Sequence, residues 1–216
     1  MRAGSDDTPP AVEGAVGRAL AALASPELLT GCRRIEAADA RYLLPAEDAS
    51  IATREAGARA ATGAGRRLAH DLLRRLGQAD LAVLRGSHGS PIWPNGIVGS
   101  IAHDEELAVA VAAPAGALRS VGVDIEPPLP LPDDLRPVVL TALDRLGDLD
   151  PGMGGRVLFA VKEAVYKAAF PLDGRVLGFE DIAVDLGSGK AVTSSGRRMA
   201  VRFAIHPMIL ALAYTR

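Results

Sequence analysis

The chain has 216 residues, 49% of them hydrophobic and 23% charged, which is a globular balance and enough for one large domain or two small ones. Its 24 Lys and Arg residues against 26 Asp and Glu residues give a net charge of −2, so no overall basic field favours nucleic acid or an anionic membrane. The single Cys32 excludes an internal disulfide framework, and together with the lack of a membrane-length apolar run or a signal-peptide core it predicts a cytoplasmic protein.

The first third of the chain is predicted to be mainly helical. Residues 1–10 are polar and proline-rich, and we expect them to be disordered. Helices are predicted at residues 11–29 and 47–76, and three glycines leave open whether the second stretch is one helix or two. Residues 35–44 hold either a strand or an irregular segment.

The second helical stretch carries Arg59 and Arg66 seven residues apart, so both lie on one face. This face is either an ordinary solvated arginine surface or a site for an anion.

A loop at residues 85–96 is dense in Gly, Ser and Pro and lies between strand candidates at 81–84 and 97–103. Such a loop offers backbone N–H groups beside Arg85 and His88, which suits a phosphate group. The alternative is a tight connection held by Trp93. His103 ends the strand 97–103, where a lone histidine is more often structural than functional.

Another strand is predicted at residues 107–113, and a further one at 121–126, where β-branched residues alternate with small or acidic ones. Side chains two apart on a strand share a face, so Asp124 and Glu126 should point the same way. Gly122 lies on that face and is predicted to leave room for a ligand. An acidic pair at a strand end is also typical of a solvated turn.

Residues 156–170 are predicted to form a helix that Pro171 ends, with Glu163 and Lys167 on one face. If this face meets the end of strand 121–126, three carboxylates converge and could hold Mg²⁺ or Mn²⁺ together with substrate phosphates. By itself, the Glu163–Lys167 pair is typical of a helix surface. Only three of the basic residues are lysines and two of them lie in this helix, which indicates a task for a compact ammonium group.

The rest of the C-terminal part is predicted to be an extended connector at 127–132, a helix at 133–146, a loop at 148–155 and an antiparallel set of strands at 182–186, 199–205 and 208–214. Helices precede strands in each half of the chain. The sequence therefore predicts an α+β fold with two similar subdomains, 11–116 and 117–216.

The motif Gly-Val-Asp-Ile-Glu at 122–126, followed about forty residues later by Lys-Glu-Ala-Val-Tyr-Lys at 162–167, resembles the signature of the 4′-phosphopantetheinyl transferases of the surfactin- and enterobactin-synthetase type. The segments 65–70, 85–96, 99–103 and 170–181 resemble further blocks of that family in the same order. Three positions depart from the pattern. Ala102 replaces a hydroxyl residue, His88 stands where lysine is common, and Arg59 matches a basic position one residue out of register.

The resemblance implies a pseudo-dimer of two α+β subdomains in a single monomeric chain. It also implies that the protein transfers the 4′-phosphopantetheine arm of coenzyme A to a serine of an acyl or peptidyl carrier protein, in fatty-acid, polyketide or nonribosomal-peptide (siderophore) synthesis, and releases adenosine 3′,5′-bisphosphate. Asp124, Glu126 and Glu163 would hold Mg²⁺. Glu163 would also serve as base, and Lys167 would bind phosphate. The implied coenzyme A contacts are Arg59, Arg66, Arg85, His88, Ser100, His103, Asp124 and Lys167.

Two other functions fit the same residues. A Mg²⁺-dependent hydrolase of a nucleotide diphosphate would need the carboxylates but no carrier protein. A non-catalytic module that binds coenzyme A would need the phosphate contacts but not all three carboxylates, which this chain retains.

Overall fold

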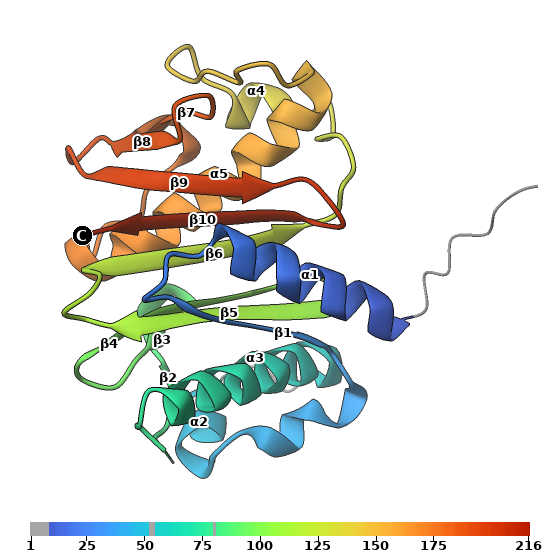
Figure 1. Cartoon of the computed structure of the whole chain (residues 1–216), viewed down its shortest axis with the longest axis vertical. Coiled ribbons are helices and arrows are strands. Elements are labelled where there is room, and N and C mark those ends of the chain that lie inside the picture. The colour runs from blue at the N-terminus through green and yellow to red at the C-terminus, as the bar shows by residue number, and fades with distance from the viewer. Residues whose placement is uncertain (1–8, 52–54, 80) are drawn as a thin grey trace, which may run out of the picture.

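The computed structural model describes residues 9–51, 55–79 and 81–216. Two antiparallel sheets meet in the middle of the molecule and carry helices on their faces (Figure 1). This arrangement confirms the predicted α+β class. Residues 1–8 of the segment expected to be disordered lie outside the described residues, whereas residues 9 and 10 begin the first helix.

The first sheet has the strand order β1-β5-β4, with β1 at Leu29–Arg34, β5 at Leu107–Pro114 and β4 at Ile97–His103. Helix α3 (Ala56–Arg75) covers one face of this sheet, where Leu68 and Leu72 pack against alanines of β5. Small side chains keep this contact close, since a Cβ atom added at Gly65 would lie 2.7 Å from Ile101.

The second sheet has the order β6-β10-β9-β8-β7. Its strands are β6 (Ser120–Glu126), β10 (Ile209–Thr215), β9 (Arg198–Ala204), β8 (Lys190–Thr193) and β7 (Ile182–Asp185). Helix α5 (Pro151–Asp173) lies along one face of this sheet and packs mainly on β6 and β10. The two sheets meet where β4 runs beside β6, and there the Val123 N–H donates a hydrogen bond to Ser100 Oγ at 3.1 Å.

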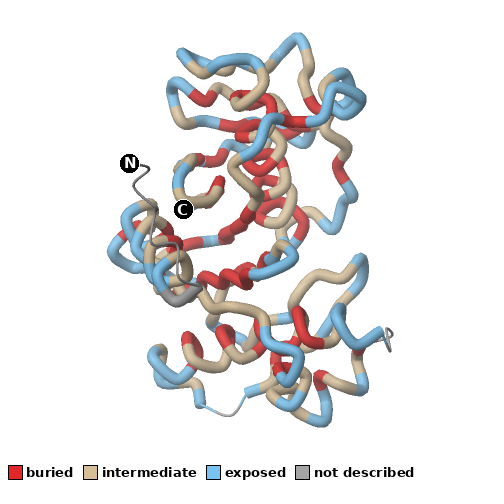
Figure 2. Tube along the Cα trace, turned by 90° about the vertical axis from the view of Figure 1, so that its right-hand side faces the viewer, coloured by how far each residue is buried: buried red, intermediate tan, exposed pale blue. Residues whose placement is uncertain are grey.

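Side chains along β6 point alternately to the two faces of the sheet. Val121, Val123 and Ile125 enter the core that also holds Val16 and Leu20 of α1 (Pro9–Leu23). The even-numbered residues of β6 therefore face α5, and these include Asp124 and Glu126. Figure 2 shows buried segments running through the sheets and α5, with exposed segments mostly in the outer turns.

The remaining elements are short. They are the helices α2 (Pro45–Ser50) and α4 (Arg136–Val139), the hairpin of β2 (Leu84–Arg85) with β3 (Pro91–Ile92), and 3-10 turns at Ala37–Tyr42, Ser87–Gly89 and Phe179–Asp181. The stretch 47–76 thus contains two helices, with residues 52–54 between them outside the described part. The stretch 35–44 is mainly a 3-10 turn.

Several boundaries predicted in the C-terminal part were wrong. The helix expected at 133–146 is reduced to the four residues of α4, because Asp144 instead closes a turn by accepting hydrogen bonds from the N–H and hydroxyl of Thr141. The loop expected at 148–155 is the start of α5, which Asp150 caps. Pro171 does not end α5; the helix continues to Asp173 and closes at Gly174, whose φ is 63°.

Strand predictions were closer. The strands at 97–103, 107–113 and 121–126 are confirmed, as are those near 182–186, 199–205 and 208–214. The candidate at 81–84 shrinks to the two-residue β2, and β1 and β8 were not predicted.

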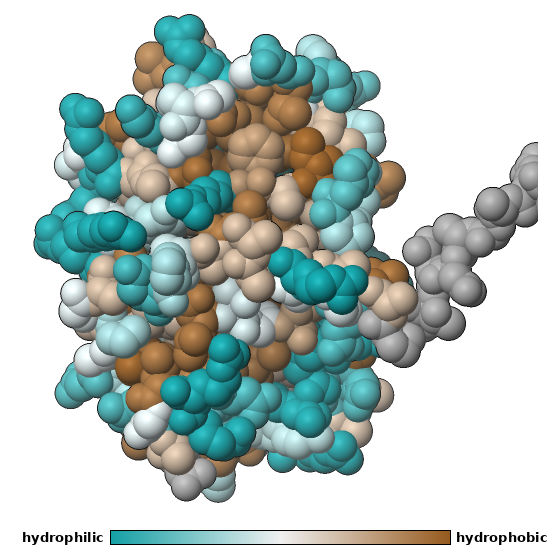
Figure 3. Space-filling model, in the orientation of Figure 1, coloured by the Kyte–Doolittle hydropathy of each residue, from teal (hydrophilic) through white to brown (hydrophobic). Residues whose placement is uncertain are grey.

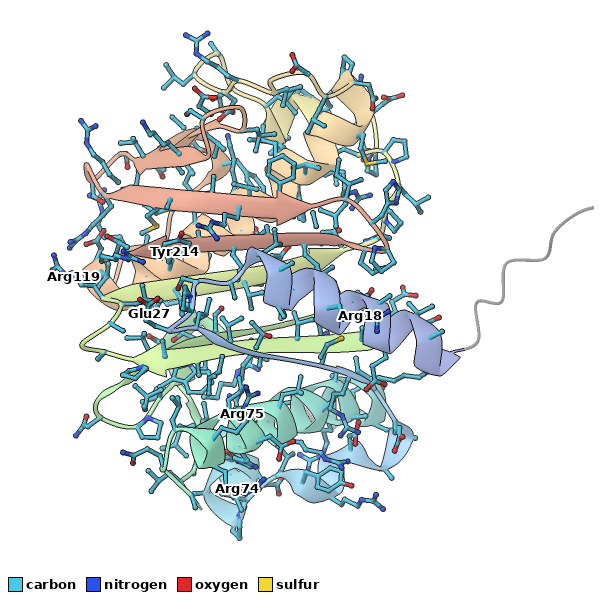
Figure 4. All side chains as sticks on the ribbon, viewed as in Figure 1. Arg18, Glu27, Arg74, Arg75, Arg119 and Tyr214 are labelled. Carbon is cyan, nitrogen blue, oxygen red and sulfur yellow. The ribbon has the colours of Figure 1, made fainter. Side chains whose placement is uncertain are left out.

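The face of the molecule that carries α1 has a mixed surface, with hydrophilic groups interrupted by hydrophobic patches (Figure 3). Arg74 and Arg75 in the last turn of α3 lie apart from Arg18 on α1 and from Arg119 beside β6 (Figure 4). This distribution fits the absence of a net basic charge in the sequence. Among the described residues, no helix is both long and apolar enough to cross a membrane.

Candidate active site

Helix α5 and strand β6 run side by side in opposite directions. Ser120 Oγ donates a hydrogen bond to the Ala168 carbonyl at 2.6 Å, near the start of the strand. Further along, a Cβ atom added at Gly122 would lie 1.9 Å from the Ala164 carbonyl oxygen. The space predicted for a ligand at Gly122 is therefore taken by the backbone of α5. The glycine brings the helix, rather than a ligand, close to the strand.

This close approach joins Asp124 of β6 to Lys167 of α5. Lys167 Nζ donates to Asp124 Oδ1 at 2.6 Å and to the Val123 carbonyl at 3.3 Å. The other carboxylate oxygen, Oδ2, is buried and has no hydrogen-bond partner among the described residues. Burial raises the pKa of Asp124 above its ordinary value, and Lys167 only partly offsets this effect.

Two further carboxylates lie in the electrostatic field of Asp124. Glu126 Oε2 accepts a hydrogen bond at 2.8 Å from Arg156 of α5. Burial and then the Asp124 charge raise the pKa of Glu126, against the opposing effect of Arg156. Burial also raises the pKa of Glu163, and Asp124 adds to this shift while Lys167 opposes it. The two segments therefore bring the three predicted carboxylates into one interacting group.

No group of three or more acidic, histidine or cysteine side chains in the described part of the chain is already arranged as a metal site. The chemistry of the donors nevertheless fits a divalent cation. Asp124 has one buried oxygen without a partner in the described part of the chain, and Arg156 contacts one of the two oxygens of Glu126. Mutual repulsion among carboxylates is the condition that a bound cation relieves, and oxygen donors are those that Mg²⁺ prefers.

A cavity of about 260 Å³ opens beside this group. It is lined from one half of the chain by His88 and Ser100 and from the other half by Glu163 and Lys167. Asp124 and Glu126 do not line it; Lys167 both lines the cavity and contacts Asp124. A ligand in this cavity would therefore touch the loop and β4 on one side and α5 on the other.

The loop at 85–96 approaches α5 through His88. The backbone of His88 has a φ of 53°, a conformation uncommon for a residue with a side chain. Its ring packs edge-on against Phe170 of α5, with ring centroids 5.6 Å apart. Trp93 packs over Gly99, since a Cβ atom there would lie 2.5 Å from the indole. The loop is thus a tight connection held by Trp93, which was one of the two predicted alternatives. It also borders the cavity.

The other predicted basic residues do not line this cavity. Arg66 is buried, donates to the Leu84 carbonyl at 3.4 Å and has an Nε atom without a partner among the described residues. Its burial contradicts the solvated-face alternative at this position. Arg59 is paired with Asp48, and Arg85 is exposed and packs beside Gly89.

His103 is exposed, with Nδ1 3.1 Å from the Asp104 carbonyl, and its charge would lower the pKa of Asp124. Ala102 is buried in the apolar core beside Val109 and Val123. The departure from the family pattern at Ala102 therefore adds apolar contact within this core.

Lys162 does not share the role of Lys167. Its Nζ donates to Asp144 Oδ2 at 2.6 Å and to the carbonyls of Val139 and Phe179, each at 2.9 Å. Its side chain is fully buried. The clustering of two lysines in one helix thus has two causes, one structural and one at the cavity.

Three residues near the site were not predicted. Tyr166 and Phe170 line the cavity with Glu163, and Arg156 holds Glu126. Helical spacing could have found the aromatics, because positions three and seven after Glu163 share its face. The contact between Arg156 and Glu126 spans 30 residues of sequence and carries no local signal.

Two models of known families match this chain. The 4′-phosphopantetheinyl transferase N-terminal domain matches residues 46–113, and the 4′-phosphopantetheinyl transferase superfamily matches residues 120–207. The second match contains β6 and α5, which carry the carboxylates and Lys167.

Three curated relatives are similar to this chain. The 4′-phosphopantetheinyl transferase Npt of Nocardia iowensis is 36% identical over 157 residues, which are 70% of this chain and 71% of the relative. PptT of Mycobacterium tuberculosis is 40% identical over 54% of this chain and 53% of its own length. Svp of Streptomyces mobaraensis is 36% identical over 71% of this chain and 61% of its own length. This chain therefore belongs to the 4′-phosphopantetheinyl transferase superfamily and is an enzyme that transfers phosphopantetheine to carrier proteins.

Proposed function

We propose that the transfer depends on Mg²⁺, uses coenzyme A as donor and releases adenosine 3′,5′-bisphosphate, as in the surfactin- and enterobactin-synthetase type. The observation that carries the proposal is the cavity between the two halves, where His88 and Ser100 lie opposite Glu163 and Lys167. The cavity joins a loop suited to phosphate to the helix that carries the acid and the ammonium group. We also propose that the chain divides into the halves 11–116 and 117–216, and that the protein is monomeric and cytoplasmic.

The reaction forms a bond between the serine oxygen of the carrier and the phosphorus that bears the pantetheine arm. The bond from that phosphorus to the bridging pyrophosphate oxygen breaks at the same centre. Glu163 takes the serine proton, and its raised pKa makes it a better proton acceptor than an ordinary carboxylate. Lys167 binds the phosphate that becomes the leaving group and offsets its charge. Mg²⁺ held by Asp124, Glu126 and Glu163 would supply charge neutralisation at the pyrophosphate; Mn²⁺ could replace it.

Positive charge for the remaining phosphates comes from the first half of the chain. Burial lowers the pKa of Arg66, the Glu47 carboxylate opposes this shift, and Arg85 lies close enough to add a smaller lowering of its own. An anion bound beside both side chains would relieve this repulsion. We assign Arg59, Arg66, Arg85, His88 and His103 to the coenzyme A phosphates, with Ser100, Asp124 and Lys167 as further contacts.

The carrier protein must reach Glu163 from outside. The segment 127–155 joins β6 to α5 and exposes large apolar side chains: Leu129 is 59% exposed, Val138 55% and Leu143 69%. Arg156 ties this segment to Glu126 by donating to the Leu129 carbonyl as well. We assign the segment to carrier docking. Leu143→Asp should raise the KM for the carrier without changing that for coenzyme A, whereas Val192→Asp on β8 should change neither.

The test is the intact mass of an apo carrier protein after incubation with this enzyme, coenzyme A and Mg²⁺, with and without a chelator. A chelator-sensitive gain of one phosphopantetheine group is expected. Release of free phosphopantetheine with no change in carrier mass would indicate a hydrolase. Binding of coenzyme A without either product, tried with several carriers, would indicate a non-catalytic module.

A further inference from the structure

Two carboxylates of β6 are each held by a cation from α5. Lys167 contacts Asp124 through Oδ1, and Arg156 contacts Glu126 through Oε2. Each contact leaves the second oxygen of the carboxylate outside the ion pair. Lys167 is a residue of the family motif and lines the cavity, whereas Arg156 has neither property.

Arg156 reaches the site because of its place on α5. It lies seven residues before Glu163, which is two helical turns, so both side chains project from the same face of the helix. The strand runs opposite to the helix, so the end of β6 with Glu126 lies beside the beginning of α5. Arg156 is therefore the basic residue of α5 that meets Glu126.

The guanidinium group of Arg156 uses three of its nitrogens. Besides the 2.8 Å contact to Glu126, Nε donates to the Leu129 carbonyl at 3.3 Å and Nη2 to the Pro130 carbonyl at 3.4 Å. The segment 127–132 contains four prolines, which have no N–H group to donate, so carbonyl oxygens are its main means of attachment. A planar fork can satisfy these three acceptors at once, and a lysine ammonium lacks that fixed geometry.

Both partners are mostly shielded from water, with 14% of the Arg156 side chain and 21% of the Glu126 side chain exposed. Glu126 has three side-chain torsions and stands at the end of its strand, where backbone pairing restrains it least. The Arg156 contacts fix the carboxylate against both the helix and the following segment.

We propose that Arg156 is a positioning residue for the transfer reaction: it orients Glu126 so that the oxygen outside the ion pair can bind the divalent cation. This inference rests on the metal site of the proposed function. Residues that orient metal ligands typically change metal affinity by about 10–100-fold when they are replaced.

The experiment measures Mn²⁺ affinity of the whole protein by the electron paramagnetic resonance signal of the free ion, with Mg²⁺ as competitor. Arg156→Gln should bind Mn²⁺ roughly 10–100-fold more weakly than the wild type. Arg156→Lys keeps the charge but loses the fork, so it should recover part of the affinity. Arg197→Gln is the matched control, because Arg197 pairs with Asp173 at a partly buried position, neither residue lines the cavity, and the change should leave Mn²⁺ affinity unchanged.

Equal Mn²⁺ affinity in the wild type and Arg156→Gln would overturn the role of Arg156 while the metal site stands. A wild-type protein that takes up no Mn²⁺, even with coenzyme A, would overturn the metal site itself. If Arg156→Gln does not fold, Arg156→Lys decides: wild-type affinity counts against the proposal, and weakened binding at an unchanged melting temperature supports it. Weakening of the same size in Arg197→Gln would also count against it.

Discussion

Helix α5 carries two lysine–aspartate pairs that have the same length and different surroundings. Lys162 meets Asp144 at 2.6 Å, and Lys167 meets Asp124 at 2.6 Å. In the first pair, Nζ has two carbonyl acceptors besides Asp144, and both oxygens of Asp144 accept hydrogen bonds. In the second pair, the Lys167 side chain is 28% exposed and one oxygen of Asp124 has no partner among the described residues.

The difference separates a structural ion pair from a functional one. The closed pair, Lys162–Asp144, joins α5 to the segments around Val139 and Phe179, whose carbonyls accept from the same ammonium group. The open pair, Lys167–Asp124, leaves buried polar capacity unused, which costs folding free energy and is retained where a ligand will supply the missing contact. Distance and residue type alone do not distinguish the two pairs.

Breaking the closed pair should have the largest effect on stability. Asp144→Ala leaves the Lys162 ammonium buried without its counter-charge, and we expect a loss of about 3–5 kcal/mol in the free energy of unfolding. Urea unfolding followed by circular dichroism measures it. Asp124→Ala is the matched variant and should change stability by less than about 1 kcal/mol, because Lys167 can turn toward water. Equal losses in the two variants would remove the distinction between the pairs.

Breaking the open pair should have the largest effect on activity. Asp124→Ala removes a proposed metal ligand and the partner of Lys167, so we expect transfer to slow by roughly 10²–10³-fold or more, while the melting temperature changes little. Carrier mass after timed incubation measures the rate. Asp71→Ala, which removes an exposed partner of Arg74, should transfer at the wild-type rate. A normal rate in Asp124→Ala would exclude Asp124 from the metal site.

The sequence predicted the open pair far better than the closed one. Alternation in β6 placed Asp124 and Glu126 on one face, and helical spacing joined Glu163 to Lys167. Lys162 lies in the same motif, but its partner Asp144 lies 18 residues earlier, in a segment whose predicted helix forms only at Arg136–Val139. Only the folded chain shows that Asp144 closes a turn and accepts this lysine.

Gly122 illustrates the same limit. The sequence showed a glycine on the face of the carboxylates, and a free space for a ligand was a reasonable interpretation. The neighbour that fills the space is Ala164 of α5, more than 40 residues later, and no local sequence pattern predicts this contact. The shrinkage of the 133–146 helix and the unpredicted strands β1 and β8 likewise reflect tertiary contacts that override local preference.

The Lys167–Asp124 pair should depend on the short distance between α5 and β6, and a larger side chain at Gly122 tests this dependence. Gly122→Ala places a methyl group against the Ala164 carbonyl, between Lys162 and Lys167 along the helix, and the helix must move. We expect a stability loss of about 1–3 kcal/mol and slower transfer at saturating substrate. Gly116→Ala is the matched control, because an added Cβ atom there has no neighbour within 4 Å among the described residues. Wild-type stability and activity in Gly122→Ala would show that this approach does not position Lys167.

The smallest expected effect concerns Glu47, a buried carboxylate that resembles Asp144 because both of its oxygens have partners. Oε1 contacts His70 at 2.8 Å and accepts from the Val83 N–H at 2.7 Å, and Oε2 accepts from the Leu44 N–H at 2.9 Å. Burial alone would raise the pKa of Glu47, but these hydrogen bonds outweigh it and hold the pKa below its ordinary value. Asp124 is shifted in the opposite direction.

Because the pKa of Glu47 is lowered in the folded state, the direction in which its contribution to stability changes with pH is fixed. The stabilisation from Glu47 is complete above the pKa of the unfolded chain and is lost as the pH falls through the folded pKa. Unfolding free energies measured from neutral to acidic pH should therefore decline, by at most about 1.4 kcal/mol per pH unit for this one group. Glu47→Gln should flatten that decline, whereas Glu105→Gln at an exposed position should not. If the free energy of unfolding of Glu47→Gln declines with pH as steeply as that of the wild type, the hydrogen bonds to Glu47 do not lower its pKa. The contrast with Asp124, which has an oxygen without a partner among the described residues, would then fail.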